Sequence, residues 1–159
     1  MDSKAAGDLK GMSTPTIRRF VDEDIDRLLE IEEACFETPW TWDSFNHELN
    51  ENPYAIYYVL ELDGVIIGYC GLWLVIDEAH ITNIAVLPEL RGNKYGELLF
   101  SHAIEKAKEA GAIQLSLEVR VSNLVAQKMY RKYGLIPGGI RKNYYTDNLE
   151  DALVMWVKL

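Results

Sequence analysis

The chain has 159 residues, 48% of them hydrophobic and 26% charged, and 25 acidic side chains against 16 basic ones give a net charge of −9. This length and composition suit one compact globular domain and exclude wholesale disorder. The acidic balance disfavours direct binding to nucleic acid, and it favours a basic partner or a cationic substrate.

The first eleven residues, MDSKAAGDLKG, are small and polar, show no periodicity and are followed by Met12. We expect a leader or a linker here, the alternative being a native disordered tail, with the folded domain over residues 12–159. The longest apolar stretch, 65–76, is too short to span a bilayer, so we expect no membrane association. Cys35 and Cys70 have no partners at metal-ligand spacing, which predicts a cytoplasmic protein without a disulfide framework or a metal site.

Strands and helices alternate along the rest of the chain. The predicted strands are 16–20, 54–62, 65–76, 79–86, 113–119, 135–141 and 152–159. The predicted helices begin at the N-caps Asp22 and Thr41, end before Gly111 in the third case, and cover 123–133 in the fourth. This order predicts an α/β (α+β) domain, in which a mixed central sheet of about six to seven strands is flanked by about four helices.

The segment 83–97, NIAVLPELRGNKYGE, joins a strand to an amphipathic helix. Its two glycines, Gly92 and Gly96, precede or open the helix, and Arg91 and Lys94 add positive charge. Amide groups at a helix N-terminus together with glycines can form an anion cradle, although the same pattern also fits an ordinary strand–helix turn. No dinucleotide-binding glycine motif or Walker lysine loop is present.

With its Arg-x-x-Lys-x-Gly pattern at 91–96 after an Ile-Ala-Val-x-Pro strand, this segment resembles the acetyl-CoA pyrophosphate loop of the GNAT superfamily of N-acetyltransferases. The family pattern has glycine where this chain has Lys94, whose side chain could crowd the pyrophosphate or reach a phosphate oxygen. The motifs LEVRxSN at 117–123, Met-Tyr at 129–130, RKNYY at 141–145 and DAL at 151–153 narrow the resemblance, which covers about residues 14–159. Together they resemble the bacterial ribosomal-protein-alanine N-acetyltransferases of the RimI type, which acetylate the N-terminal amine of ribosomal protein S18.

The resemblance implies a role for each matching residue. Glu118 would be the general base, acting through a water, and Tyr130 the general acid for the departing thiolate. The residues expected to bind acetyl-CoA are Ile84, Ala85, Val86, Arg91, Gly92, Asn93, Lys94, Tyr95, Gly96, Glu97 and Asn123. Tyr144, Tyr145 and Trp40 would line the entrance for the peptide acceptor.

From spacing alone, each of these residues also has a plain structural interpretation. Glu118 lies at a strand end on the polar face opposite Leu117, where a solvated carboxylate is common. Tyr130 could be a core aromatic residue and Asn123 a helix cap, and the two are about two helical turns apart. The three histidines, at 47, 80 and 102, are too scattered in sequence to suggest a shared site.

The sequence thus predicts an acetyl-CoA-dependent N-terminal acetyltransferase whose acceptor is the S18 N-terminus or another protein N-terminus. One alternative is the same fold acting on a small amine or on lysine side chains. The other is a coenzyme-A-binding module without catalysis, in which Lys94 marks a degraded loop.

Overall fold

The computed structural model describes residues 14–159, so the expected leader or tail over residues 1–11 lies outside the described residues. Within this range seven strands form one mixed sheet in the order β2-β3-β4-β5-β6-β8-β7. Four α-helices accompany the sheet in the described chain, which confirms the predicted fold class.

The elements follow one another in an order close to the one predicted. The first half contains β2 (Thr16–Arg19), α1 (Ile25–Cys35), α2 (Trp42–Glu51), β3 (Ala55–Leu62), β4 (Val65–Val75) and β5 (Glu78–Val86). The second half contains α3 (Tyr95–Glu109), β6 (Gln114–Arg120), α4 (Leu124–Lys132), β7 (Ile136–Arg141) and β8 (Ala152–Lys158). Short 3-10 turns, η2 (Asp22–Asp24) and η3 (Pro88–Leu90), precede α1 and follow β5.

The start and end of the first helix differ from the prediction. Asp22 is not an N-cap, because the 3-10 turn η2 separates it from α1. Asp24 occupies the N-cap position of α1 without a side-chain cap hydrogen bond, and its carboxylate accepts the Val21 N–H at 2.8 Å at the start of η2. The helix ends at Cys35, and Phe36 after it is extended and 41% exposed. Thr41 caps α2 as predicted, since its hydroxyl accepts the Ser44 N–H.

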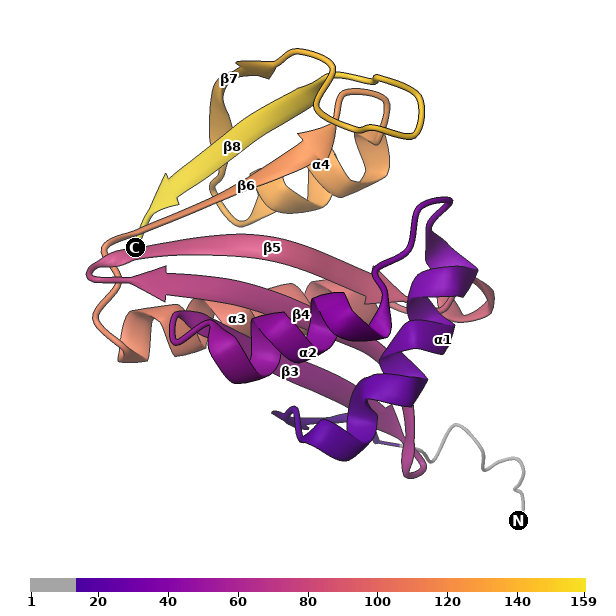
Figure 1. Cartoon of the computed structure of the whole chain (residues 1–159). Helices are drawn as coiled ribbons and strands as arrows, with labels where there is room; N and C mark the ends of the chain where they lie inside the picture. Colours follow the sequence, from indigo (N-terminus) through magenta and orange to yellow (C-terminus); the bar gives the residue numbers. More distant parts are fainter. Residues whose placement is uncertain (1–13) are drawn as a thin grey trace.

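The two faces of the sheet have different coverings. In Figure 1, α1 and α2 lie in front of β3–β5, while α3 lies behind the sheet. Along β6 the side chains alternate as predicted, with Leu115, Leu117 and Val119 buried and Ser116 and Glu118 on the other face. Phe100 of α3 is fully buried, and its ring lies 4.9 Å from that of Tyr130 on α4.

The sheet opens between its two central strands. β5 and β6 run parallel and pair only from Glu78–Gln114 to Ile81–Leu117. Beyond that point the two strands separate, as Figure 1 shows. The register of β5 against β4 shifts near Thr82, and such an irregularity bends a strand. The opening therefore exposes the end of β5 on one side and the end of β6 on the other.

Candidate active site

Glu118 is the first residue of β6 beyond its pairing with β5. Its side chain is only 9% exposed, yet both carboxylate oxygens face basic groups. His80 of β5 places Nε2 3.0 Å from Oε1, and Arg141 donates from Nε to Oε2 at 3.0 Å. The parting of the sheet thus places a nearly buried carboxylate at the base of the opening.

The charge state of Glu118 follows from these contacts. Burial raises the pKa of its carboxyl, but the hydrogen bond with His80 and the charge of Arg141 outweigh that effect and leave the pKa below its usual range. The group is therefore an ionised carboxylate at neutral pH. It can accept a proton from a neighbouring amine or stabilise the positive charge that forms there.

His80 is a residue of this site that the sequence analysis missed. Its Nδ1 lies 3.2 Å from the Ser116 hydroxyl, so the imidazole bridges Ser116 and Glu118. Parallel pairing sets His80 opposite Ser116, and Glu118 follows two residues later on the same face of β6. Only that register brings the side chains together, and the sequence contains no signal for it beyond the alternation of each strand.

Tyr130 and Asn123 lie at opposite ends of α4. Asn123 is its N-cap, with Oδ1 accepting the Ala126 N–H at 3.1 Å, which is the structural role considered above. Tyr130 is 5% exposed, and burial raises its pKa well above the ordinary value, so the phenol is protonated at neutral pH. Within residues 14–159 its hydroxyl has no hydrogen-bond partner. It is therefore able to donate a proton to a bound group.

The predicted coenzyme residues form one continuous stretch around the start of α3. Gly92 and Lys94 both have positive φ angles, of 88° and 65°. Lys94 thus adopts the left-handed conformation that glycine takes easily, at a cost of about 1–2 kcal/mol for a residue with a Cβ. This explains physically why the family pattern has glycine there.

The structure around Gly96 fits a ligand lying close to the backbone. A Cβ at Gly96 would meet only the Val86 side chain, 4.0 Å away, so packing within the protein does not require glycine here. Lys94, the N-cap of α3, makes no side-chain cap hydrogen bond, unlike Thr41 and Asn123 at α2 and α4. Amides of the first helical turn have no intrahelical partner. They can therefore bind an anion such as a pyrophosphate.

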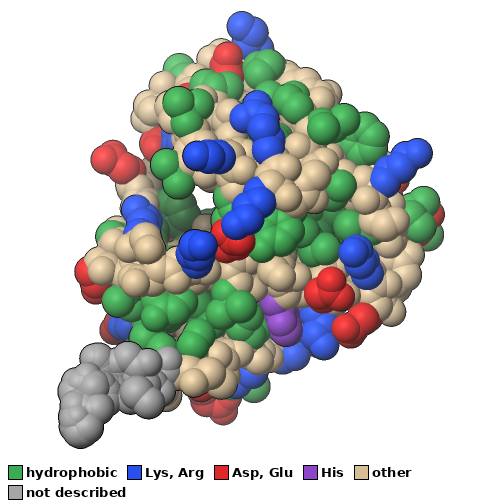
Figure 2. Space-filling model, turned by 180° about the vertical axis from the view of Figure 1, so that it is seen from behind, with side chains coloured by type: hydrophobic (Ala, Val, Ile, Leu, Met, Phe, Trp, Pro, Cys, Tyr) green, Lys and Arg blue, Asp and Glu red, His purple; other side chains and the backbone are tan. Residues whose placement is uncertain are grey.

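The other predicted coenzyme residues surround this helix start. Asn93 donates from Nδ2 to the Leu90 carbonyl, and Glu97 binds Lys132 and the Tyr133 hydroxyl, which ties α3 to α4. Ile84, Ala85 and Val86 lie in the part of β5 that β6 does not pair with. On the face turned away from Figure 1, Lys and Arg side chains gather around a narrow opening (Figure 2), although the chain is acidic overall.

The predicted acceptor residues come from two connections on the same side of the molecule (Figure 1). Tyr144 and Tyr145 lie in the segment 142–151 between β7 and β8, with their ring centroids 5.1 Å apart. Tyr144 is 46% exposed. The nearby Glu118 charge helps to raise the pKa of both phenols, after burial as the main cause. Arg141, which donates to Glu118, directly precedes this segment, so the tyrosine pair lies near the carboxylate.

Trp40 lies in the connection between α1 and α2. Its ring packs on Phe45 at 5.1 Å and on Tyr57 at 6.5 Å, and its backbone N–H donates to the buried Glu32. The Tyr57 hydroxyl donates to Asn83 of β5, so this connection is linked to the strand that borders the opening. Trp40 is thus connected through Tyr57 to the β5 border of the opening. Its expected contact with a peptide acceptor stays a prediction.

Comparison with known proteins identifies the family. The model of the acetyltransferase (GNAT) family matches residues 25–135. The chain belongs to this family. A putative ribosomal protein bS18-alanine N-acetyltransferase of Bacillus subtilis is 61% identical over 90% of this chain and 95% of its own length. The bS18-alanine N-acetyltransferase of Haemophilus influenzae is 38% identical over 83% of this chain and 90% of its own.

A solved structure shows the same fold. The crystal structure of the ribosomal-protein-S18-alanine N-acetyltransferase from Escherichia coli matches with a TM-score of 0.85 and 31% identity, covering 91% of this chain and 94% of that one. Acetyltransferases of the GNAT family use acetyl-CoA as the acetyl donor. None of the helices in residues 14–159 is long and apolar enough to cross a membrane.

Proposed function

We propose that this GNAT acetyltransferase acetylates the N-terminal α-amine of a protein, with the N-terminus of ribosomal protein S18 as its acceptor. The observation that carries the proposal is the Glu118 carboxylate, nearly buried beside the Tyr144–Tyr145 pair where β5 and β6 separate. The names of the relatives, one of them 61% identical, support S18 as the acceptor.

Acetyl-CoA would occupy the opening of the sheet and supply the acetyl group as a thioester. The amides of residues 92–97 would hold its pyrophosphate, with the charges of Arg91 and Lys94 beside them. The free edge of β5 at residues 84–86 would bind its pantetheine amides, and Asn123 keeps its amide nitrogen available for the same part. Gly96 leaves the space that such a ligand requires.

In the reaction the amine nitrogen forms an amide bond with the acetyl carbon, and the carbon–sulfur bond breaks. Glu118 accepts the proton that the amine loses, either directly or through one water. Tyr130 donates a proton to the sulfur. A general base or a general acid typically accelerates such a reaction by about 10²–10⁴-fold, and each of the two groups contributes a factor of this size.

The acceptor class follows from acidity and charge. An N-terminal amine has a pKa of about 7.7–8.0, against about 10.4 for lysine, so it is easier to deprotonate by roughly 3.5 kcal/mol at pH 7. A carboxylate with a low pKa is a weak base, and it therefore suits the more acidic amine. The net charge of −9 also suits a basic ribosomal-protein tail.

Intact-mass spectrometry of two synthetic peptides tests the proposal. One peptide carries the S18 N-terminus with a free α-amine and internal lysines, and its twin has that amine blocked. With acetyl-CoA and the purified protein, we expect one acetyl group on the free peptide and none on the twin. Acetylation of both would assign the enzyme to lysine side chains. Coenzyme binding without acetylation of either peptide would point to another acceptor or to a non-catalytic binder.

Variants then test the assigned residues. Glu118→Gln is expected to lower turnover about 10²–10⁴-fold while acetyl-CoA still binds, and Tyr130→Phe is expected to lower it similarly. Glu61→Gln is a matched control, because Glu61 also binds an arginine, Arg18, but lies on β3 far along the sheet. An unchanged rate in Glu118→Gln would remove Glu118 from the mechanism.

A further inference from the structure

The segment 142–151 holds its shape without regular secondary structure. Asn143 and Leu149 both have positive φ, 53° and 61°, in the left-handed region that side chains disfavour. Two backbone hydrogen bonds, Tyr145 N–H to Glu150 O at 3.2 Å and Leu149 N–H to Tyr145 O at 2.8 Å, fold the segment onto itself. Contacts from outside must hold so unfavourable a backbone.

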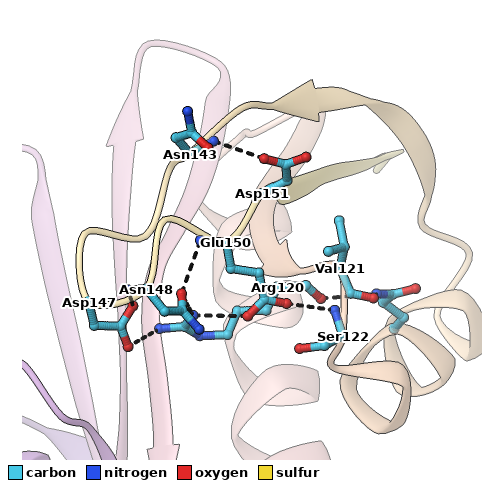
Figure 3. Close-up of polar contacts among 9 residues, drawn as sticks. Arg120, Val121, Ser122, Asn143, Asp147, Asn148, Glu150 and Asp151 are labelled. Atoms are coloured by element: carbon cyan, nitrogen blue, oxygen red, sulfur yellow. Dashed lines mark hydrogen bonds and ion pairs between the residues drawn. The ribbon is translucent and has the colours of Figure 1, made fainter.

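Most of those contacts converge on one side chain, Arg120 at the end of β6 (Figure 3). Its Nη2 donates to the Asp147 carboxylate at 2.7 Å, and its Nη1 donates to Glu150 at 3.0 Å and to Asn148 Oδ1 at 3.1 Å. The guanidinium also lies 4.1 Å from the ring centroid of Tyr145. One group therefore binds three side chains of the segment and stacks on one of its tyrosines.

The carboxylates on Arg120 and their neighbours also fix the segment to the backbone around β6. The second oxygen of Glu150 accepts the Ser122 N–H at 2.9 Å, and the Asp151 carbonyl accepts the Val121 N–H at 3.2 Å. The Asp151 carboxylate accepts the Asn143 N–H at 2.9 Å and so joins the two ends of the segment to each other. The Ser122 hydrogen bond, together with Arg120, lowers the pKa of Glu150 to about 2. The segment is thus fastened to the end of β6 through its last residues, and its partners stay charged.

Arg120 with its partners Asp147 and Glu150, here called the clamp, holds the tyrosine pair in a fixed position relative to β6. Arg120 follows Glu118 by two residues, so both side chains lie on the same face of β6. The strand that carries the base therefore also carries the group that holds Tyr144 and Tyr145 in place. Lysine could keep the charge here, but not the planar fork that reaches three partners at once.

We propose that Arg120 is a positioning residue for acceptor binding, which fixes the Tyr144–Tyr145 wall relative to Glu118. This inference rests on the proposed function, since the proposed function assigns Tyr144 and Tyr145 to the binding of a peptide acceptor. Within residues 14–159 the Arg120 side chain contacts neither residues 91–97 nor the Glu118 carboxylate, and only its backbone carbonyl, which a substitution retains, accepts the Asn123 N–H at 3.0 Å. Loss of the Arg120 side chain should consequently weaken the binding of the acceptor and leave the binding of acetyl-CoA unchanged.

Steady-state kinetics of Arg120→Gln with the S18 peptide tests this inference. We expect the KM for the peptide to rise about ten-fold, the KM for acetyl-CoA to change less than two-fold, and Arg120→Lys to restore part of the loss. Asp147→Asn, which removes the charge of one partner and alters shape little, should raise the peptide KM by a smaller factor. An unchanged peptide KM, or an equal rise for acetyl-CoA, would overturn the proposal.

Arg18→Gln is the matched control. Arg18 also binds two carboxylates, Asp24 and Glu61, but it lies on β2 at the opposite edge of the sheet. We expect its loss to leave both KM values unchanged. If Arg18→Gln raised the peptide KM as much as Arg120→Gln does, the effect would come from general destabilisation and the inference would fail.

Amide hydrogen exchange separates this inference from the proposed function. The Ser122, Asn143 and Tyr145 amides should exchange at least ten-fold faster in Arg120→Gln than in the parent protein, with or without an acceptor. Unchanged exchange would refute the clamp even if the peptide is acetylated. Faster exchange in a protein that acetylates no peptide would establish the clamp and refute the proposed acceptor.

Discussion

The connection 36–41, which carries Trp40, and the segment 142–151, which carries Tyr144 and Tyr145, are the two predicted walls of the acceptor entrance. They lie on the same side of the molecule (Figure 1), but different kinds of chemistry hold them. The connection that carries Trp40 depends on Glu32, which is 2% exposed and accepts neutral donors, the Trp40 N–H and the Tyr69 hydroxyl. The segment that carries Tyr144 and Tyr145 depends on Arg120, a cation with carboxylate partners at the surface. Hydrogen bonds to a buried carboxylate hold the first wall, and ion pairs near the surface hold the second.

The difference appears in the pKa values. Burial raises the pKa of Glu32, because its neutral partners only partly replace water around the charge. Hydrogen bonds from Arg120 and from the Asn148 backbone help to lower the pKa of Asp147. A buried carboxylate with neutral partners thus resists ionisation, whereas a surface carboxylate with a cation favours it.

The largest effect should come from the buried wall. Glu32→Ala leaves the Trp40 N–H and the Tyr69 O–H donors without their acceptor in the core and opens a cavity, so we expect the free energy of unfolding to fall by about 3 kcal/mol. Urea denaturation measures this change. Glu33→Ala, at the exposed neighbouring position, should stay within about 0.5 kcal/mol of the parent. Equal values for the two variants would show that Glu32 does not hold this wall.

A smaller effect should follow when the Glu118 carboxylate loses its contact with His80. In His80→Leu, Glu118 loses the hydrogen bond that lowers its pKa, so the acid limb of the pH profile of kcat/KM should move to higher pH. We expect a loss of activity of about five-fold at pH 7, a small part of what a missing base would cost. His47→Gln removes an exposed histidine of α2 and should change neither quantity. A profile that stays in place would separate His80 from the function of Glu118.

The smallest effect is a pair of opposite pH dependences. Glu32 has a raised pKa in the folded state, so its contribution to stability is fully present below about pH 4.5 and is lost as the pH rises through the folded pKa. Glu150 has a lowered pKa of about 2, so its contribution is present above about pH 4.5 and is lost as the pH falls toward 2.

Thermal unfolding over pH 2–7 should therefore give difference curves of opposite slope. Relative to Glu32→Gln the parent protein should lose stability with rising pH, and relative to Glu150→Gln it should lose stability with falling pH. Two slopes of the same sign would contradict the opposite pKa shifts of Glu32 and Glu150.

Much of the candidate site was accessible from local sequence. The alternation of β6 placed Glu118 on the face opposite Leu117, and the glycines at 92 and 96 marked the loop before α3. These features depend on neighbours along the chain, and local steric and hydrogen-bonding preferences determine them. The cap at Asp22 was wrong because a 3-10 turn over Asp22–Asp24 precedes α1, and a capping residue alone does not distinguish a 3-10 start from an α-helical one.

The sequence by itself determined the order of the elements, the buried faces of the strands and the family, because these depend on periodicity and on short motifs. Only the tertiary structure decided that His80 and Arg141 bind Glu118, that Arg120 holds the tyrosine segment, and that Glu32 holds Trp40. Each of these contacts joins residues 8 to 38 positions apart, and strand register or loop path sets it. A side chain's partners across such distances are fixed by the packing of the whole sheet, which no local pattern encodes.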